Sequence, residues 1–303
     1  MPSSWKLTAF GPKPLIRDAL VAQEDVLDWD PDIVLTGFEL SDDRPDDWRL
    51  DAYLPREPTA RDRAEIKALF ASKAPRFTAE KLPDEDWVTL SQEGIEPIRA
   101  GRFNVHTPEF EPEAVPGVVN FAIPASQAFG TGQHATTAGC LALLDAMKQG
   151  GVVARNVADI GTGTGLLAFA ALELWPSALA TASDIDPVCA QVVEDNAALN
   201  GVALGARPGA VTMVIADGMS DPLLQARGPY DLFIANILAG PLVELAEEFG
   251  DAVAPGGNLL LAGLLETQEP RVRRAYRARG FRLAARLVNG DWSILWLRKR
   301  RGR

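Results

Sequence analysis

The sequence has few of the residues that bind transition metals or form covalent crosslinks. Two cysteines, Cys140 and Cys189, and two histidines, His106 and His134, occur in 303 residues. So few cysteines exclude a disulfide framework and favour a reducing compartment. No cysteine lies at zinc-ligand spacing from a histidine, so the sequence predicts no metal site.

Long hydrophobic runs and an excess of positive charge are also missing. No apolar stretch approaches the roughly 20 residues of a membrane-spanning helix, and the start, Met1–Trp5, does not resemble a signal peptide. We therefore expect a cytoplasmic protein with no membrane partner. The 30 Lys and Arg against 41 Asp and Glu give a net charge of −11, which disfavours direct binding to DNA. The basic end, 298–303, is interpreted as a solvated terminus, with contact to RNA as the alternative.

The first 80 residues alternate short strands and helices. Hydrophobic residues make up 47% of the chain and charged residues 23%, which is typical of a folded protein of one or two domains. The expected strands are 5–10, 33–40, 48–54 and 77–82, and the expected helices are 14–23 and 60–74. This β-α-β-β-α-β order predicts a small ferredoxin-like α+β domain over 1–80. Residues 81–125 are predicted to form a connector and the front edge of the next domain, with a helix start at 83–87 and a strand at 102–105.

Residues 126–303 predict a regular α/β domain. Buried-type strands are expected at 156–160, 180–183, 211–216, 232–235 and 258–262, separated by helices at 136–148, 166–175, 187–200, 241–253 and 270–279. This alternation predicts a mostly parallel sheet with helices on both faces. The last segments predict an antiparallel hairpin with strands at 281–288 and 292–297 and a turn at Asn289-Gly290.

A glycine-rich turn, Asp159-Ile-Gly161-Thr-Gly163-Thr-Gly165, lies between a predicted strand and a helix. Glycines there allow the backbone to turn tightly beside a nucleotide-like ligand. Asp184 ends the next strand, where its carboxylate is placed to accept hydrogen bonds from ribose hydroxyls. A dinucleotide site prefers a third glycine where Leu166 stands. The spacing therefore favours S-adenosylmethionine, and a simple tight turn is the alternative.

Two further segments contain candidate site residues. The loop 128–137 holds Thr136 and Thr137, which are candidates to cap the following helix, and His134, which is either a structural histidine or a general base. Asn236 ends the fourth strand of the parallel sheet. Its amide oxygen is suited to orient an amine nucleophile, and hydrogen bonding to the backbone at the strand end is the structural alternative.

Five motifs follow one another in the order of a known family. They are 129–137 (FGTGQHATT), 159–165 (DIGTGTG), 184–186 (DID), 196–201 (NAALNG) and 235–241 (ANILAGP). Together with the stretch from 86 to 106, they resemble the PrmA family, the ribosomal protein L11 methyltransferases. The resemblance spans about residues 84–297. Gln133 and Ala135 depart from it at variable loop positions, and the basic end is not part of it.

The resemblance implies a Rossmann-like class I methyltransferase domain over 126–303, with a seven-stranded sheet, and a substrate-recognition role for 1–80. It implies transfer of methyl groups from S-adenosylmethionine to lysine or α-amino groups of L11, either free or on the ribosome. By this resemblance Thr137, Gly161, Asp184 and Asn236 contact the cofactor, and Asn236 orients the amine. The alternatives are a methyltransferase acting on another amine and, with less support, a nicotinamide-dependent oxidoreductase.

Overall fold

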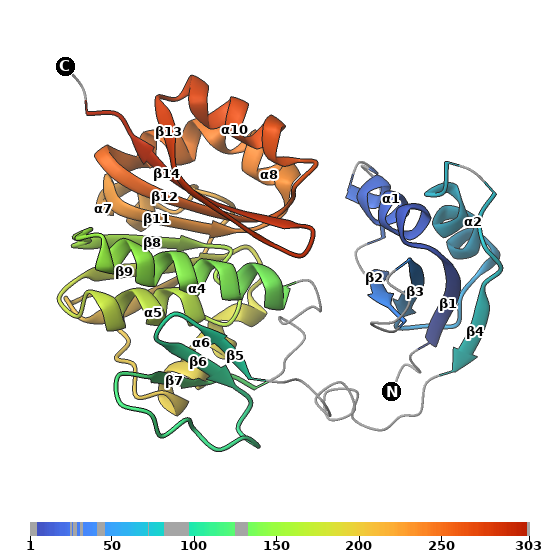
Figure 1. Ribbon diagram of the computed structural model, residues 1–303, viewed down its shortest axis with the longest axis horizontal. Coiled ribbons are helices and arrows are strands. Elements are labelled where there is room, and N and C mark those ends of the chain that lie inside the picture. Colours follow the sequence, from blue (N-terminus) through green and yellow to red (C-terminus); the bar gives the residue numbers. More distant parts are fainter. Residues whose placement is uncertain are drawn as a thin grey trace. The chain divides into compact units, whose positions relative to one another are not determined.

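The chain forms two compact units, Met1–Trp87 and Val88–Arg303, which are described one at a time (Figure 1). The computed structural model describes residues 5–24, 26, 29–30, 33–40, 46–71, 73–81, 97–124 and 133–301. Within these ranges, no helix combines the length and the apolar character needed to cross a membrane.

The first unit is a four-stranded antiparallel sheet covered by two helices on the same side (Figure 1). The strands are β1 (Trp5–Pro12), β2 (Val34–Glu39), β3 (Asp47–Leu54) and β4 (Thr78–Lys81), and the helices are α1 (Lys13–Glu24) and α2 (Ala60–Ala68). The strand order β2-β3-β1-β4 is that of a ferredoxin-like fold, which confirms the predicted fold class. Alternate residues of β1 and β3, including Leu7 and Leu50, pack against Ile16 and Ile66 of the helices.

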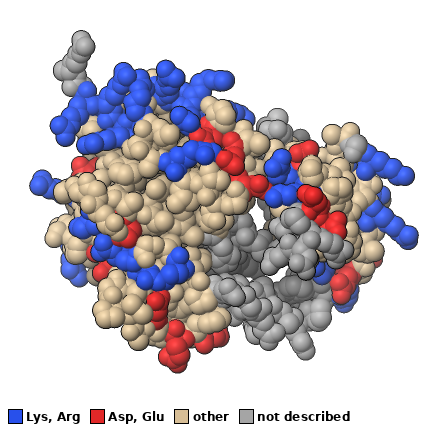
Figure 2. Space-filling model, viewed as in Figure 1, with Lys and Arg blue, Asp and Glu red and all other residues tan. Residues whose placement is uncertain are grey.

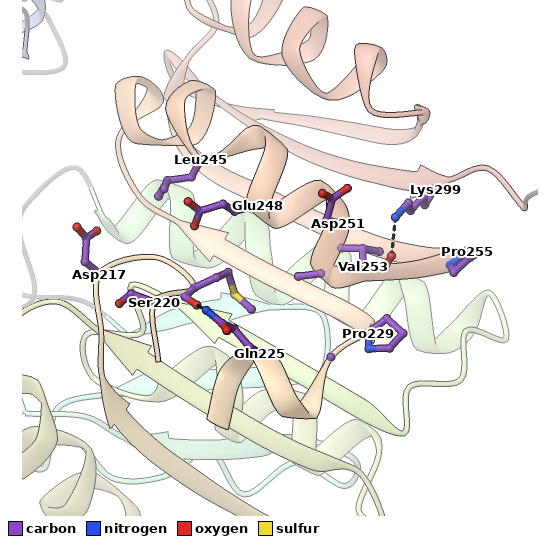
Figure 3. Close-up of a pocket in the computed structure, with 13 residues that line it drawn as sticks. Asp217, Ser220, Gln225, Pro229, Leu245, Glu248, Asp251, Val253, Pro255 and Lys299 are labelled. Atoms are coloured by element: carbon purple, nitrogen blue, oxygen red, sulfur yellow. Dashed lines mark hydrogen bonds between the residues drawn. The ribbon is translucent and has the colours of Figure 1, made fainter. Parts of the chain in front are cut away.

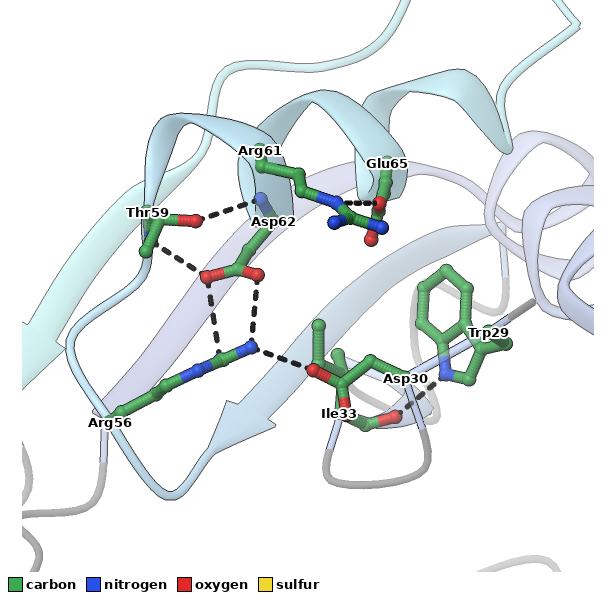
Figure 4. Close-up of polar contacts among 8 residues, drawn as sticks. All are labelled: Trp29, Asp30, Ile33, Arg56, Thr59, Arg61, Asp62 and Glu65. Atoms are coloured by element: carbon green, nitrogen blue, oxygen red, sulfur yellow. Dashed lines mark hydrogen bonds and ion pairs between the residues drawn. The ribbon is translucent and has the colours of Figure 1, made fainter.

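Helix α2 begins at a reciprocal cap (Figure 4). The Thr59 hydroxyl accepts a hydrogen bond from the Asp62 backbone N–H at 3.2 Å, and the Asp62 carboxylate accepts one from the Thr59 N–H at 2.7 Å. Arg56 donates to Asp62 and to Asp30 across the fold. The two exchanged bonds satisfy backbone donors that a helix start leaves unpaired.

Helix α2 ends at Ala68, six residues before the predicted end at 74. Leu69 forms the C-cap, and Leu69 and Phe70 are both buried; Phe70 packs edge-on against Phe77 with ring centroids 6.1 Å apart. Burial of these side chains in the core therefore overrides the helical pattern of the following residues. The helix start predicted at 83–87 lies outside the described residues.

The second unit begins with a small sheet of β5 (Ile98–Ala100), β6 (Phe103–His106) and β7 (Val119–Ala122). Strand β6 corresponds to the strand predicted at 102–105, whereas β5 and β7 were not predicted. Asn200 joins this sheet to a helix behind it, because its side chain accepts from the Ala122 N–H and donates to the Ala122 carbonyl, each at 2.8 Å. Asp145 binds the Arg102 guanidinium at 2.7 Å and makes a second tie.

A seven-stranded sheet forms the centre of the second unit, in the order β10-β9-β8-β11-β12-β14-β13. Its strands are β8 (Asn156–Ile160), β9 (Leu179–Asp184), β10 (Ala210–Ile215), β11 (Tyr230–Asn236), β12 (Val253–Leu265), β13 (Phe281–Asn289) and β14 (Trp292–Lys299). Only β14 runs against the others, since it pairs antiparallel with both β12 and β13. The predicted mostly parallel sheet with a C-terminal antiparallel hairpin is confirmed.

Helices cover both faces of this sheet (Figure 1). One face carries α4 (Gln133–Gln149), α5 (Leu166–Leu174) and α6 (Val188–Leu199), and the other carries α7 (Pro222–Arg227), α8 (Ala239–Glu244), α9 (Ala246–Ala252) and α10 (Glu269–Ala278). Successive strand residues enter opposite cores: Val157 packs in the first and Ala158 in the second. A strand that is buried on both sides is nearly continuously hydrophobic, as the sequence pattern indicated.

Three helices on this scaffold differ from the sequence prediction. The helix expected at 241–253 is divided at Leu245, which ends α8 and begins α9. Helix α7 was not predicted; the Asp221 carboxylate caps it by accepting from the Leu223 N–H. Helix α4 begins at Gln133, three residues before the predicted start.

Candidate functional site

Three of the four predicted cofactor residues lie in one row at the carboxyl edge of the large sheet. Ile160 of β8 is in register with Ser183 of β9 on one side and with Ala235 of β11 on the other. The next residues on these three strands are Gly161, Asp184 and Asn236. Neighbouring strands lie about 4.8 Å apart, so these positions share one edge. Ligands of such sheets bind at this edge, outside the carboxyl ends of the strands.

The glycine loop has a left-handed backbone at three positions. Gly161, Gly163 and Gly165 have φ of 69°, 55° and 85°, a region that glycine enters without steric cost. A Cβ on Gly161 would lie 2.2 Å from the Ile237 side chain, whereas a Cβ on Gly163 would meet nothing within 4 Å. Gly161 is therefore required by the packing of the protein, and Gly163 borders open space.

Asp184 ties this loop to the neighbouring strand. Its Oδ2 accepts a hydrogen bond from the Gly163 N–H at 2.9 Å, and its Oδ1 accepts one from the Asp186 N–H at 3.1 Å. Each carboxylate oxygen has a further lone pair that remains available to a ligand. The Asp186 carboxylate accepts from the Val188 N–H at 2.9 Å, just before the start of α6.

Asp159, the first residue of the glycine motif, supports the loop from below. Its fully buried Oδ2 accepts from the Thr162 hydroxyl at 2.7 Å and from the Ala168 N–H at 3.1 Å. Burial raises the pKa of this carboxyl to about 7; the two hydrogen bonds oppose the rise, and the negative charge of Asp184 adds to it. The loop is thus held by one buried carboxyl with a raised pKa, Asp159, and by one half-buried carboxyl, Asp184.

Asn236 stands at the end of β11 and is half-buried. Among the residues that the structure describes, none forms a hydrogen bond with its side-chain amide. The next residue, Ile237, is enclosed on two sides, because a Cβ on Gly263 would lie 2.2 Å from the Ile237 carbonyl oxygen. The two glycines, Gly161 and Gly263, therefore allow the chain after Asn236 to pass between β8 and β12.

Thr137 lies in the first part of α4, at the same edge of the sheet. The Asn289 side chain, in the turn of the C-terminal hairpin, donates to the Ala135 carbonyl at 3.1 Å. The hairpin turn is at the carboxyl edge because Trp292 pairs with Leu265, the last residue of β12. Thr137 is buried and lies inside the helix, so its predicted capping role is wrong, since α4 starts earlier.

The other members of that predicted loop are placed only in part. Thr136 is buried beside Thr137 and, for the same reason, is not a cap. The side chain of His134 and residues 128–132 lie outside the described part of the chain.

A pocket of about 840 Å³ lies on the face covered by α7 and α9 (Figure 3). Asp217, Glu248 and Asp251 contribute carboxylates to its wall at separated points. The Lys299 amine at its far end donates to the carbonyls of Gly250 and Val253. Gly161, Asp184 and Asn236 are not among the residues that line it, so this pocket is distinct from the row at the carboxyl edge. Across the described ranges, no group of three His, Cys, Asp or Glu side chains is placed to hold a metal ion.

Comparison with known proteins places this arrangement in a family. A family model described as ribosomal protein L11 methyltransferase (PrmA) matches residues 13–300. The ribosomal protein L11 methyltransferase of Agrobacterium fabrum is 37% identical over 270 residues, which cover 88% of this chain and 90% of that protein. The protein of the same name from Rhizobium meliloti is 39% identical over 259 residues, covering 84% and 86%. The chain belongs to the PrmA family.

A solved structure supports the same relationship. The ribosomal protein L11 methylase of Lactobacillus delbrueckii subsp. bulgaricus aligns with a TM-score of 0.56 and 26% identity, over 67% of this chain and 98% of that one. The family resemblance that the five motifs indicated is therefore confirmed for this PrmA-family chain.

Two residues of the family motifs support this PrmA-family site in ways that the sequence did not predict. Ile237 fills the space above Gly161, and no sequence pattern signals this contact. Asn196 donates from α6 to the Thr164 carbonyl of the glycine loop at 2.9 Å and is fully enclosed. The spacing of Asn196 and Asn200, one helical turn apart, indicates that both side chains lie on one face of the helix. This pattern of two polar residues was the available sequence signal for Asn196.

Proposed function

We propose that this chain transfers methyl groups from S-adenosylmethionine to lysine side chains or α-amino groups of ribosomal protein L11. The single observation that carries the proposal is the aligned row of Gly161, Asp184 and Asn236 in a member of the PrmA family. L11 is the substrate that the names of the relatives print. The reaction is proposed to occur in the cytoplasm, on L11 that is either free or on the ribosome.

The residues at the carboxyl edge fit the cofactor. The open space at Gly163 leaves room for a ligand against the loop backbone. The free lone pairs of Asp184 are suited to accept hydrogen bonds from two ribose hydroxyls. Thr137, Gly161, Asp184 and Asn236 are the residues proposed to contact S-adenosylmethionine, which supplies a methyl group already activated by a positively charged sulfur.

The work left to the protein is to bind, orient and desolvate the amine. A lysine amine with a pKa of about 10.4 is almost entirely protonated at neutral pH, so the site must favour its neutral form by excluding water. Asn236 is proposed to accept a hydrogen bond from that amine through its side-chain oxygen. Such a bond directs the nitrogen lone pair toward the methyl group, which is catalysis by positioning. The first unit, 1–80, is proposed to recognise the substrate.

The test is mass spectrometry of purified L11 after incubation with the protein and labelled S-adenosylmethionine. Added methyl groups on lysine or the α-amine are expected, and the variant Asp184→Ala is expected to add none. A panel of other ribosomal proteins and a small amine are the comparison substrates. Methylation of one of these, with L11 left unmodified, would overturn the proposed substrate but not the proposed chemistry.

A further inference from the structure

The net charge of −11 conceals a strongly basic surface on the second unit. Eleven of the 30 Lys and Arg residues lie between Arg271 and Arg301, together with one acidic residue, Asp291. Ten of the eleven are arginines. Figure 2 shows that they gather over the region where Figure 1 labels α10 and β13. We call the basic residues of 271–286 and 298–301 the arginine face.

Within the described part of the chain, several guanidinium groups of this face have no acidic partner. Arg273 is paired with Glu269 at 2.9 Å, and Arg286 binds Glu269 at 2.6 Å. In contrast, Arg271, Arg274 and Arg277 are exposed on α10 and form no ion pair with any residue that the structure describes. Their charge is therefore available to a ligand.

The face also holds like charges against one another. Arg282 of β13 is directly opposite Arg298 of β14, and the Arg300 N–H donates to the Gly280 carbonyl at the same end of the hairpin. Partial removal from water lowers the pKa of Arg282, and the positive charges of Arg300 and Arg277 lower it further. Like charges opposite each other in a sheet are destabilising. The repulsion between Arg282 and its basic neighbours is relieved when an anionic partner binds beside them.

The chemistry of the face separates the possible partners. The apolar residues of α10, Val272 and Tyr276, are fully buried in the core, so the helix has no apolar side to insert into a lipid surface. Protein interfaces are centred on exposed aromatic or aliphatic anchors. The large apolar residues exposed here are only Leu283 and Val288 among the described residues 269–301, at 38% and 37%. Guanidinium groups match phosphate in geometry and charge.

We propose that the arginine face binds the phosphate backbone of RNA. The choice of RNA over DNA rests on the proposed function, since a ribosomal protein is bound to RNA in its assembled form. Arg298 pairs with Asn258 of β12, and Asn258 in turn pairs with Leu232 of β11. Leu232 lies toward the start of β11 and Asn236 lies at its end, so Arg298 is near the edge of the sheet opposite Asn236. The face thus begins at the edge away from the cofactor row and continues along α10.

The test measures binding of the full chain to a fluorescent RNA duplex, as a function of salt concentration. The variant Arg271→Gln/Arg274→Gln/Arg277→Gln removes the three unpaired charges. Lys148→Gln/Arg155→Gln/Arg207→Gln is the matched control, because it removes three charges of the same unit outside the face. The logarithm of the association constant falls as the logarithm of the salt concentration rises, and each lost phosphate contact makes this negative slope shallower by about 1. We expect the first variant to make the slope shallower by about 2 to 3 and to raise Kd at least ten-fold. We expect the control to change Kd less than two-fold.

Three outcomes would overturn the proposal: equal RNA affinity of the two variants, tighter binding to a DNA duplex of the same sequence, or binding to anionic lipid vesicles with none to RNA. Methylation of free L11 by the α10 variant separates this proposal from the proposed function. Normal methylation with weakened RNA binding supports both. If the natural chain does not methylate L11 and the α10 variant still loses RNA binding, the arginine face remains an RNA site. Only its proposed link to the ribosomal protein is then withdrawn.

Discussion

The Asp184 carboxylate and the Gly163 backbone N–H are joined by a 2.9 Å hydrogen bond that links the glycine loop of β8 to the end of β9. One side chain therefore both shapes the loop and faces the edge at which a ligand binds. A carboxylate at this position uses some of its lone pairs to accept hydrogen bonds from the protein. The remaining lone pairs are available to ribose hydroxyls.

Replacing Asp184 by Ala is expected to abolish cofactor binding without unfolding the chain. Loss of hydrogen bonds to a charged group costs about 1.5 to 3 kcal/mol each, so losing two predicts a Kd at least 100-fold higher. Titration calorimetry with S-adenosylmethionine measures the Kd, and thermal unfolding checks the fold. Asp184→Asn is the matched control and is expected to bind with intermediate affinity. Unchanged affinity in the Ala variant would exclude this residue from the site.

Gly161 and Gly163 are expected to respond differently to alanine. Both have positive φ, which costs an alanine roughly 1 to 2 kcal/mol. Only Gly161→Ala also meets the Ile237 side chain, and overpacking adds about 1 to 3 kcal/mol. Denaturant unfolding should thus show a larger loss of stability for Gly161→Ala, whereas Gly163→Ala should mainly weaken cofactor binding. Equal losses of stability would mean that the Ile237 contact does not constrain Gly161.

The framework of this site was predictable from the sequence because the physical signals are local. Strand 156–160 matches β8 residue for residue, because the apolar residues Val157, Ala158 and Ile160 stand directly before the glycine-rich turn and are buried in the sheet. The order of strands and turns then placed Gly161, Asp184 and Asn236 at one edge. The contact of Ile237 with Gly161 was not predictable, because it depends on how two separate strand ends pack.

The arginine face shows a different limit of sequence reasoning. In a chain with a net charge of −11 the arginines of α10 do not stand out, and only 298–303 forms a continuous basic run. The hairpin pairing brings Arg298 opposite Arg282 and Arg300 beside Gly280, at the end of α10. A net charge describes the whole surface, whereas binding depends on where the charges gather.

The cap of α2 offers a test of the first unit alone. Thr59→Ala removes the acceptor of the Asp62 N–H and is expected to lower stability by about 1 kcal/mol. Hydrogen exchange should show faster opening of α2 with unchanged protection of the seven-stranded sheet. Thr59→Ser keeps the hydroxyl and should behave like the natural chain. Equal loss of protection in both units would show that they unfold as one.

Asp159 predicts a pH dependence of stability whose sign follows from its raised pKa. The unfolded carboxyl releases its proton near 3.8, whereas the folded one keeps it until about 7. Between these values the folded state holds the extra proton, so the free energy of unfolding falls as pH rises, by up to about 1.4 kcal/mol per pH unit. The stabilisation is complete below pH 3.8 and is lost as pH passes through 7. Denaturant unfolding at pH 5, 6 and 7 measures the slope.

The control for this slope is Asp159→Asn, whose amide oxygen still accepts from Thr162 and Ala168 but does not titrate. Subtracting its slope removes the contribution of every other group that titrates in the same interval. The difference between the natural chain and the variant is expected to be negative between pH 5 and 7. A difference of zero would mean that Asp159 is already ionised in the folded protein at pH 5, and that its two donors outweigh the cost of burying the charge.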